Sequence, residues 1–83
     1  MINLGIREKL PIGSIVLDNE SYDNSIIGTT LDGRVIYEFS SMVEEYMADN
    51  DCCEEEAIDW IEYNTIRAIP YFGDKAPIIV NYI

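Results

Sequence analysis

The segment "SIIGTTLDGRVIYEF", residues 25–39, predicts a β-hairpin and thereby decides the fold. Two short runs rich in β-branched and aromatic residues, 25–30 and 34–39, flank the dipeptide Asp32-Gly33. An Asp-Gly pair is typical of a type I′ turn, because both central positions of that turn need a positive φ. Side chains along a strand alternate between its two faces. In the second run the predicted inward set is Val35, Tyr37 and Phe39, and the outward set is Ile36 and Glu38.

Two helices are predicted after the hairpin. The first covers "SSMVEEYMADN", residues 40–50, where Ser41 and Glu44 fit a capping box. Its apolar stripe consists of Met42, Val43, Tyr46 and Met47. The second helix is expected to begin near Cys52 or Cys53 and to end before Pro70, which disfavours helix at the preceding residue. Its expected core face is Ala57, Ile58, Ile61, Thr65 and Ala68.

Two further short segments complete the expected architecture. "GSIVLD" (13–18) reads as an edge strand, and "APIIVNYI" (76–83) reads as a last strand. The element order is then β-β-β-α-α-β. This order indicates a single α+β domain over residues 1–83, with a small antiparallel sheet of three to four strands and a pair of helices. No apolar run approaches the ~20 residues of a membrane span, and the first ten residues lack a signal-peptide pattern, so a cytoplasmic protein is expected.

The charge of the chain is strongly acidic and unevenly distributed. It has 16 acidic residues against 5 basic ones, and no histidine. Between residues 35 and 66 there is no Lys or Arg, whereas ten residues are acidic: Glu38, Glu44, Glu45, Asp49, Asp51, Glu54, Glu55, Glu56, Asp59 and Glu62. Such a surface repels nucleic acid and anionic membranes and attracts basic proteins. The alternative is that the acidity serves only solubility.

The second predicted helix has two further stripes beside its core face. Glu55, Asp59 and Glu62 form an acidic stripe, and Trp60, Tyr63 and Arg67 form a third stripe. Tyr63 and Arg67 are four residues apart, so their side chains can stack. Two interpretations of the aromatic pair stay open. It either packs under another segment as a satellite core or forms an exposed contact patch, since Trp, Tyr and Arg are enriched in binding hot spots.

No pattern in the sequence points to catalysis, a cofactor or a dedicated metal site. There is no His, and the five glycines are too scattered for a phosphate-binding loop. Cys52-Cys53 lacks the spacing of a zinc site and is expected to be two reduced thiols. The segment "DNDCCEEE" (49–56) lacks the central glycine of an EF-hand loop. A helix-turn-helix that binds DNA is rejected because its second helix would present carboxylates to phosphates.

Three stretches carry a resemblance to a known group of proteins: "SIIGTTLDGRVIYEF", "EEEAIDWIEYNTIRAIPY" and "APIIV". Together they cover roughly the last 60 residues, and "EYNTIRAIPY" is the most specific piece. The chain resembles small uncharacterised acidic proteins of phages and mobile elements of Gram-positive, clostridia-like bacteria. That group has no assigned activity. The resemblance implies an accessory gene product, and short phage accessory proteins include anti-CRISPR inhibitors that mimic nucleic acid.

The functional hypothesis is a non-enzymatic inhibitor that uses its acidic helical face to block a basic nucleic-acid-binding host protein, with a CRISPR effector as the expected partner. The expected partner-binding residues are Glu44, Glu45, Asp49, Asp51, Glu55, Asp59 and Glu62, with Trp60, Tyr63 and Arg67 as anchors. The alternative is a small structural or accessory protein that homo-oligomerises, for example as a homodimer, through the aromatic stripe or a sheet edge. No cofactor and no direct contact with nucleic acid or membrane are expected in either case.

Overall fold

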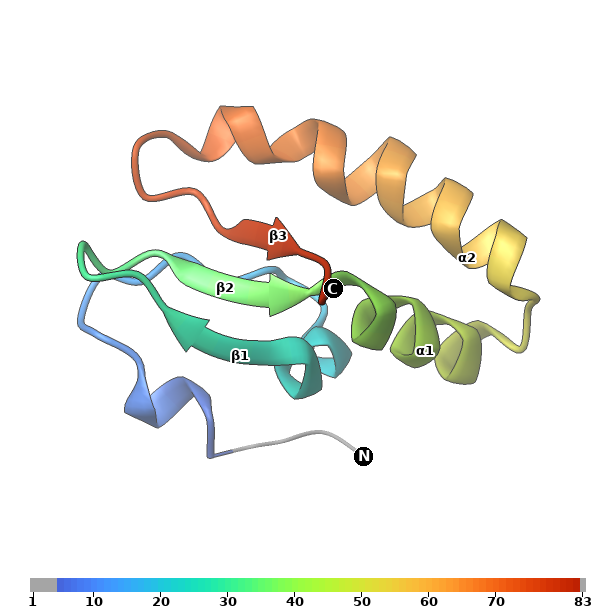
Figure 1. Ribbon diagram of the computed structural model, residues 1–83, viewed down its shortest axis with the longest axis horizontal. Coiled ribbons are helices and arrows are strands. Elements are labelled where there is room, and N and C mark those ends of the chain that lie inside the picture. Colours follow the sequence, from blue (N-terminus) through green and yellow to red (C-terminus); the bar gives the residue numbers. More distant parts are fainter. Residues whose placement is uncertain (1–4, 83) are drawn as a thin grey trace.

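The computed structural model describes residues 5–82 and has an α+β fold, as the sequence predicts. Its sheet contains β1 (Ile26–Thr29), β2 (Val35–Glu38) and β3 (Ile78–Val80), in the spatial order β1-β2-β3. Helix α1 (Phe39–Asn50) follows β2 directly, and α2 (Glu54–Trp60) begins the long helical path that runs back above the sheet (Figure 1). Ile83, the end of the predicted last strand, lies outside the described residues.

The sheet is mixed, so the expectation of a purely antiparallel sheet is wrong. β1 and β2 pair antiparallel, whereas β2 and β3 pair parallel, with Tyr37 opposite Ile79. Parallel neighbours need a crossover connection. Here both helices and the chain that follows them form that crossover, which returns the chain to the end of the sheet where β2 begins (Figure 1). The continuous apolar run Ile78–Val80 of β3 says nothing about its direction.

The hairpin lies where the sequence predicts it, but its turn is of a different type. Of its two central residues only Gly33 has a positive φ, at 91°, so the turn is not type I′. Gly33 N–H donates to Thr30 O at 3.0 Å, and Thr30 N–H donates to Arg34 O at 2.8 Å. This three-residue loop needs a left-handed glycine only at its last position. Val35 and Tyr37 are fully buried, as the predicted register requires.

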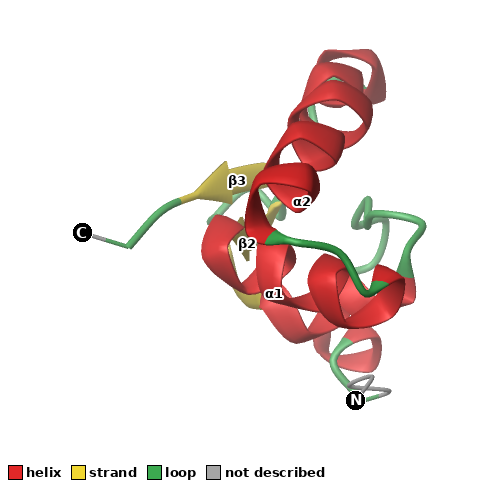
Figure 2. Cartoon of the chain, turned by 90° about the vertical axis from the view of Figure 1, so that its right-hand side faces the viewer, coloured by secondary structure: helices red, strands yellow, loops and turns green. Residues whose placement is uncertain are grey.

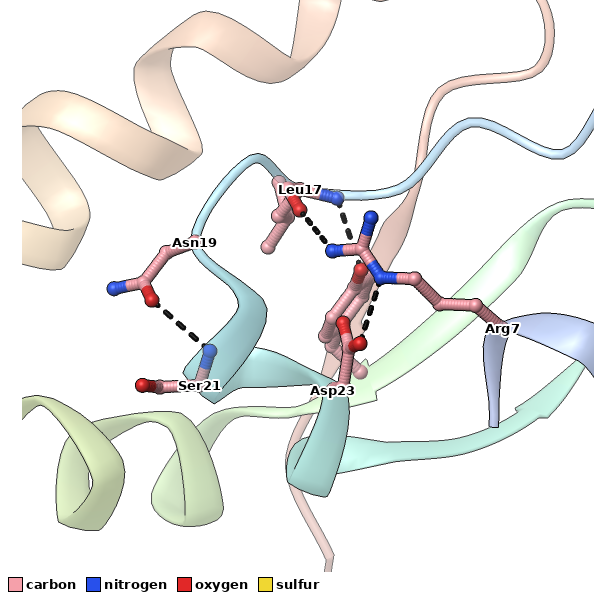
Figure 3. Close-up of polar contacts among 6 residues, drawn as sticks. Arg7, Leu17, Asn19, Ser21 and Asp23 are labelled. Carbon is pink, nitrogen blue, oxygen red and sulfur yellow. Dashed lines mark hydrogen bonds and ion pairs between the residues drawn. The ribbon is translucent and has the colours of Figure 1, made fainter. Parts of the chain in front are cut away.

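The predicted edge strand at 13–18 is not a strand, which corrects the expected element order to β-β-α-α-β. Hydrogen bonds that involve side chains attach this segment to the rest of the protein, instead of the backbone hydrogen bonds of a strand (Figure 3). Leu17 N–H donates to the Tyr37 hydroxyl at 2.9 Å, and Arg7 Nη2 donates to Leu17 O at 3.1 Å. Arg7 Nε also pairs with the buried Asp23 carboxylate at 2.6 Å. The segment therefore packs on the core without joining the sheet.

Helix α1 begins earlier than the predicted capping box. Its N-cap is Glu38, the last residue of β2, whose carboxylate accepts hydrogen bonds from the backbone N–H groups of Ser40 and Ser41, each at 2.9 Å. The hydroxyl groups of Ser25 and Ser41 are hydrogen-bonded at 2.9 Å, and Glu44 is exposed. The predicted Ser41–Glu44 box is therefore wrong. A carboxylate at the helix N-terminus satisfies the same orphan donors and also interacts favourably with the helix dipole.

The helical path that starts with α2 does not end before Pro70. It continues as a π-helical segment, Ile61–Thr65, and a 3₁₀ segment, Ile66–Phe72, and it stops at Gly73, whose φ is 86°. In an α-helix the proline ring would clash with the carbonyl four residues earlier. The chain around Pro70 is not α-helical, so the clash is avoided and the helical direction is kept.

The hydrophobic core lies between the sheet and the two helices. The buried members of its main cluster are Leu17, Tyr22, Val35, Tyr37, Met42, Val43, Ala57 and Ile61. Met42 and Val43 come from the predicted stripe of the first helix, and Ala57 and Ile61 come from the predicted core face of the second. Tyr46, Met47, Ile58, Thr65 and Ala68, the other members of those two faces, are half-buried. Both helical patterns are thus confirmed.

Candidate functional site

The candidate site is the end of the molecule where α1 turns into α2. We call it the acidic corner, and it comprises Glu44, Glu45, Asp49, Asp51, Glu54, Glu55, Glu56, Asp59 and Glu62. All of these side chains are exposed except Glu45, which is half-buried. Figure 2 looks onto this end, with the connection between the two helices in front. Glu38, the tenth acidic residue between residues 35 and 66, does not belong to it because its side chain is 5% exposed and caps α1.

Local helix geometry sets the distribution of charge within the acidic corner. Glu54, Glu55 and Glu56 occupy the first turn of α2, where the positive end of the helix dipole favours carboxylates. Glu55, Asp59 and Glu62 follow one another at spacings of four and three residues, and all three are exposed, as the acidic stripe predicts. Asp51 ends α1 in the left-handed conformation, with φ of 49°, and so turns the chain toward α2.

The basic residues do not neutralise the acidic corner. Across residues 5–82 the one ion pair is Arg7–Asp23, on the N-terminal segment. Arg34 Nε donates to Ala76 O at 2.8 Å, and Lys75 Nζ donates to Asp32 O. The segments that carry these bases lie toward the opposite end of the molecule (Figure 1). Arg67 lies five residues beyond Glu62 on the same helical path, and among the described residues it forms no ion pair with a carboxylate of the acidic corner.

Trp60 and Tyr63 lie at the surface, which decides between the two interpretations of the aromatic pair. Trp60 is 42% exposed and Tyr63 is 67% exposed, so neither belongs to a satellite core. The ring of Trp60 stacks on Tyr46 of α1, with 4.9 Å between ring centroids and 27° between ring planes. Sequence reasoning placed Tyr46 in the apolar stripe of its own helix and missed this contact. Helical periodicity describes one helix at a time and contains no signal for a pair between two helices.

The predicted contact between Tyr63 and Arg67 is confirmed. The Arg67 guanidinium carbon lies 4.6 Å from the centroid of the Tyr63 ring. Tyr71 is 90% exposed and lines the same shallow surface pocket as Tyr63 and Arg67. Sequence reasoning missed Tyr71 because it ended the helix at Pro70.

The two cysteines are free thiols at the start of α2. Cys53 is exposed, and its Sγ donates to Glu56 Oε1 at 3.3 Å. Cys52 is half-buried, and desolvation together with the nearby carboxylate of Glu56 raises its pKa. A raised pKa lowers the thiolate fraction and therefore the reactivity of the thiol. Among the described residues, no three Cys, Asp or Glu side chains are arranged to hold a metal ion.

A cavity of about 250 Å³ lies beside Trp60, lined among others by Tyr22, Asn64 and Thr65. The Tyr22 hydroxyl is enclosed there, and among residues 5–82 it completes no hydrogen bond of ordinary geometry. Burial raises the pKa of Tyr22 to about 12, and the nearby Thr65 side chain opposes the rise. This tyrosine is thus held neutral at physiological pH. It supports the packing of the helical path on the core.

Comparisons of the chain with protein-family models, with curated proteins and with solved structures find no match. In the part of the chain that the structure describes, no helix has the length and apolar character needed to cross a membrane.

Proposed function

We propose that this protein is a non-enzymatic inhibitor that binds a basic, nucleic-acid-binding surface of a host protein through its acidic corner. One observation carries the proposal: eight exposed carboxylates lie along α1, α2, the turn between them and the start of the segment after α2, and no base among the described residues pairs with them. Like charges held together cost folding stability. The Lys and Arg side chains of a cationic partner surface supply the missing counter-charge. The same side chains neutralise the phosphates of a bound nucleic acid.

The aromatic residues next to the acidic corner support a protein partner. Trp60 is held by its stack on Tyr46, and Tyr63 is held by Arg67, so both exposed rings are already ordered before binding. Ordered aromatic side chains lose little conformational entropy on binding, and Trp, Tyr and Arg are enriched in binding hot spots. The acidic corner provides long-range attraction, and Trp60 and Tyr63 provide local anchors.

The resemblance to acidic phage proteins narrows the proposed partner to a CRISPR effector in the cytoplasm of a bacterial host. The test is competition. The protein is added to a guide-RNA-loaded effector bound to labelled target DNA, and displacement of the DNA is followed at several salt concentrations. We expect displacement that weakens steeply as salt rises, because each neutralised cation contributes to the salt dependence.

The variant E55K/D59K/E62K reverses the acidic stripe and should abolish displacement. The matched control E8K/E20K/D74K reverses three exposed acidic residues elsewhere and changes the net charge equally. It should keep most of the displacement. If the protein displaces no DNA at any salt concentration, or if both variants lose displacement equally, the proposal is contradicted.

Homo-oligomerisation remains a second candidate function because of the edges of the sheet. Both β1 and β3 are outer strands of the described sheet, and Ile27 of β1 is 45% exposed. An unpaired edge strand is a template for pairing with another copy. Light scattering coupled to gel filtration distinguishes the candidates. A dimer that persists at high salt favours this function, whereas a monomer excludes it.

A further inference from the structure

An apolar groove lined by one carboxylate from each helix lies between α1 and α2, within the acidic corner. Its volume is about 250 Å³. We call it the α1–α2 groove and define it by its apolar residues, Phe39, Val43, Met47 and Ile58, and by its two carboxylates, Glu44 and Glu54. Glu54 was not among the residues that the sequence singled out for binding.

The spacing of these residues explains why the α1–α2 groove forms. Phe39, Val43 and Met47 follow one another at four-residue intervals, so they line one side of α1. Glu54 and Ile58 have the same spacing on α2. Val43 is 6% exposed and forms the floor. Phe39, Met47 and Ile58 are only half-buried, so apolar surface is left uncovered along the groove.

The chemistry of the lining selects the occupant. An apolar channel with a carboxylate on each helix suits an aliphatic stem that ends in a cation, as in Arg and Lys side chains. No basic residue lines the α1–α2 groove, so the charges of Glu44 and Glu54 are free for an incoming cation. A volume of about 250 Å³ is small for an ordinary ligand pocket of ~300–1,000 Å³ and suits a single side chain.

Between the two cations, the geometry favours arginine. A planar guanidinium presents donors in several directions and can bond two carboxylates on opposite sides, whereas an ammonium acts as a compact point charge. We infer that the α1–α2 groove binds an arginine side chain of the basic partner, with its stem on Met47 and Ile58 and its guanidinium between Glu44 and Glu54. This inference rests on the proposed function and adds a specific anchor to it.

The direct test uses small probes and the whole chain. Methyl NMR spectra are recorded while n-butylguanidinium, guanidinium or n-butylammonium chloride is added at millimolar concentration. We expect saturable shifts of the Val43, Met47 and Ile58 methyl groups with n-butylguanidinium. Guanidinium has no stem and should give weak, unsaturated shifts. Absence of saturable shifts at these methyl groups overturns the inference, and equal binding of n-butylammonium overturns the assignment to arginine.

A pair of matched variants tests the role of the two groove carboxylates, Glu44 and Glu54. E44Q/E54Q removes both carboxylates of the groove, and E45Q/E55Q removes the neighbouring carboxylate on each helix. Both variants change the net charge by the same amount. We expect E44Q/E54Q to weaken n-butylguanidinium binding about tenfold, because two charge-assisted hydrogen bonds are lost, and E45Q/E55Q to weaken it much less. Equal weakening would mean that only general charge matters, and the inference would fail.

A deca-arginine peptide separates the failure of this inference from failure of the proposed function. If the peptide binds with steep salt dependence but the groove methyl groups do not shift, the inference is wrong and the proposed function is supported. If the peptide does not bind the protein even at low salt, the proposed function fails and the inference fails with it. Amide spectra of E44Q/E54Q and of E45Q/E55Q that match the wild type away from the substituted residues show that the fold is intact in both variants.

Discussion

Tyr46 of α1 and Trp60 of α2 stack with 4.9 Å between their ring centroids, and this contact joins the two helices of the acidic corner. Both helices carry carboxylates that repel one another across the turn. The stack therefore holds together two elements that their charges push apart. Because Trp60 is 42% exposed, the same ring can also contact a partner.

The first prediction concerns this stack. Tyr46→Leu and Trp60→Leu each keep an apolar side chain and remove one ring, so the double-mutant cycle isolates the aromatic contact. We expect a coupling of roughly two- to tenfold in the unfolding equilibrium constant, since stacked pairs contribute beyond their buried area. Urea unfolding of the four proteins measures it. Additive effects of the two substitutions would show that the stack does not stabilise the corner.

The second prediction concerns the attachment of the N-terminal segment. Tyr37→Phe removes the hydroxyl that accepts the hydrogen bond from Leu17 N–H. A buried donor is then left unsatisfied, so we expect a loss of about 1–3 kcal/mol in the free energy of unfolding. The matched control is Tyr63→Phe at an exposed position, for which we expect a change within about 0.5 kcal/mol. Denaturant unfolding measures both, and equal effects would contradict the role of this bond.

The third prediction concerns stability in acid. Hydrogen bonds from the Ser40 side chain and from the backbone of Ser40 and Ser41 lower the pKa of Glu38 in the folded protein. Its folded pKa lies below its unfolded value, so its contribution to stability is present above the unfolded pKa, about 4.5, and is lost as pH falls through the folded pKa. We expect Glu38→Gln to destabilise at neutral pH and to flatten the pH dependence below about pH 4.5.

Unfolding free energies of the wild type and of Glu38→Gln, measured from neutral pH to strongly acidic pH, check this expectation. Asp74→Asn, at an exposed position outside the helices and strands, serves as the control and should keep most of the acid dependence of the wild type. An unchanged slope in Glu38→Gln would show that the cap does not contribute to acid stability.

The fourth prediction concerns stability in base. Burial raises the pKa of Tyr22 to about 12, above the value of 10.0 expected for an unperturbed tyrosine. The unfolded state therefore loses its proton first, so the contribution of Tyr22 is present below pH 10 and falls as pH rises toward 12. Tyr22→Phe should reduce this loss of stability. Tyrosinate absorbance during a pH titration should likewise lose its most basic component, and a titration identical to wild type would contradict the burial of Tyr22.

The fifth prediction concerns repulsion within the acidic corner. Asp59→Lys and Glu62→Lys each remove one carboxylate beyond the first turn of α2, so we expect the thermal midpoint to rise by about 1–4 °C at low salt. Glu55→Lys should give a smaller rise because it also loses the favourable interaction with the helix dipole. Thermal unfolding at low and high salt measures these effects. Gains that persist unchanged at high salt would exclude charge repulsion as their cause.

Local patterns in the sequence determined the elements and the surface they present. The position of the hairpin follows from the Asp32-Gly33 dipeptide, and the burial of Val35 and Tyr37 and the acidic stripe follow from periodicity within a few residues. The contact between Tyr63 and Arg67 is predictable for the same reason, since four-residue spacing in a helix brings side chains together.

Tertiary structure decided the features that depend on distant segments. The direction of β3 and the exclusion of residues 13–18 from the sheet both depend on which donors and acceptors the fold brings close. The exposure of Trp60 depends on the position of Tyr46 on another helix. Such pairings are set by packing between elements, and an amphipathic pattern records only which side of one element faces the core.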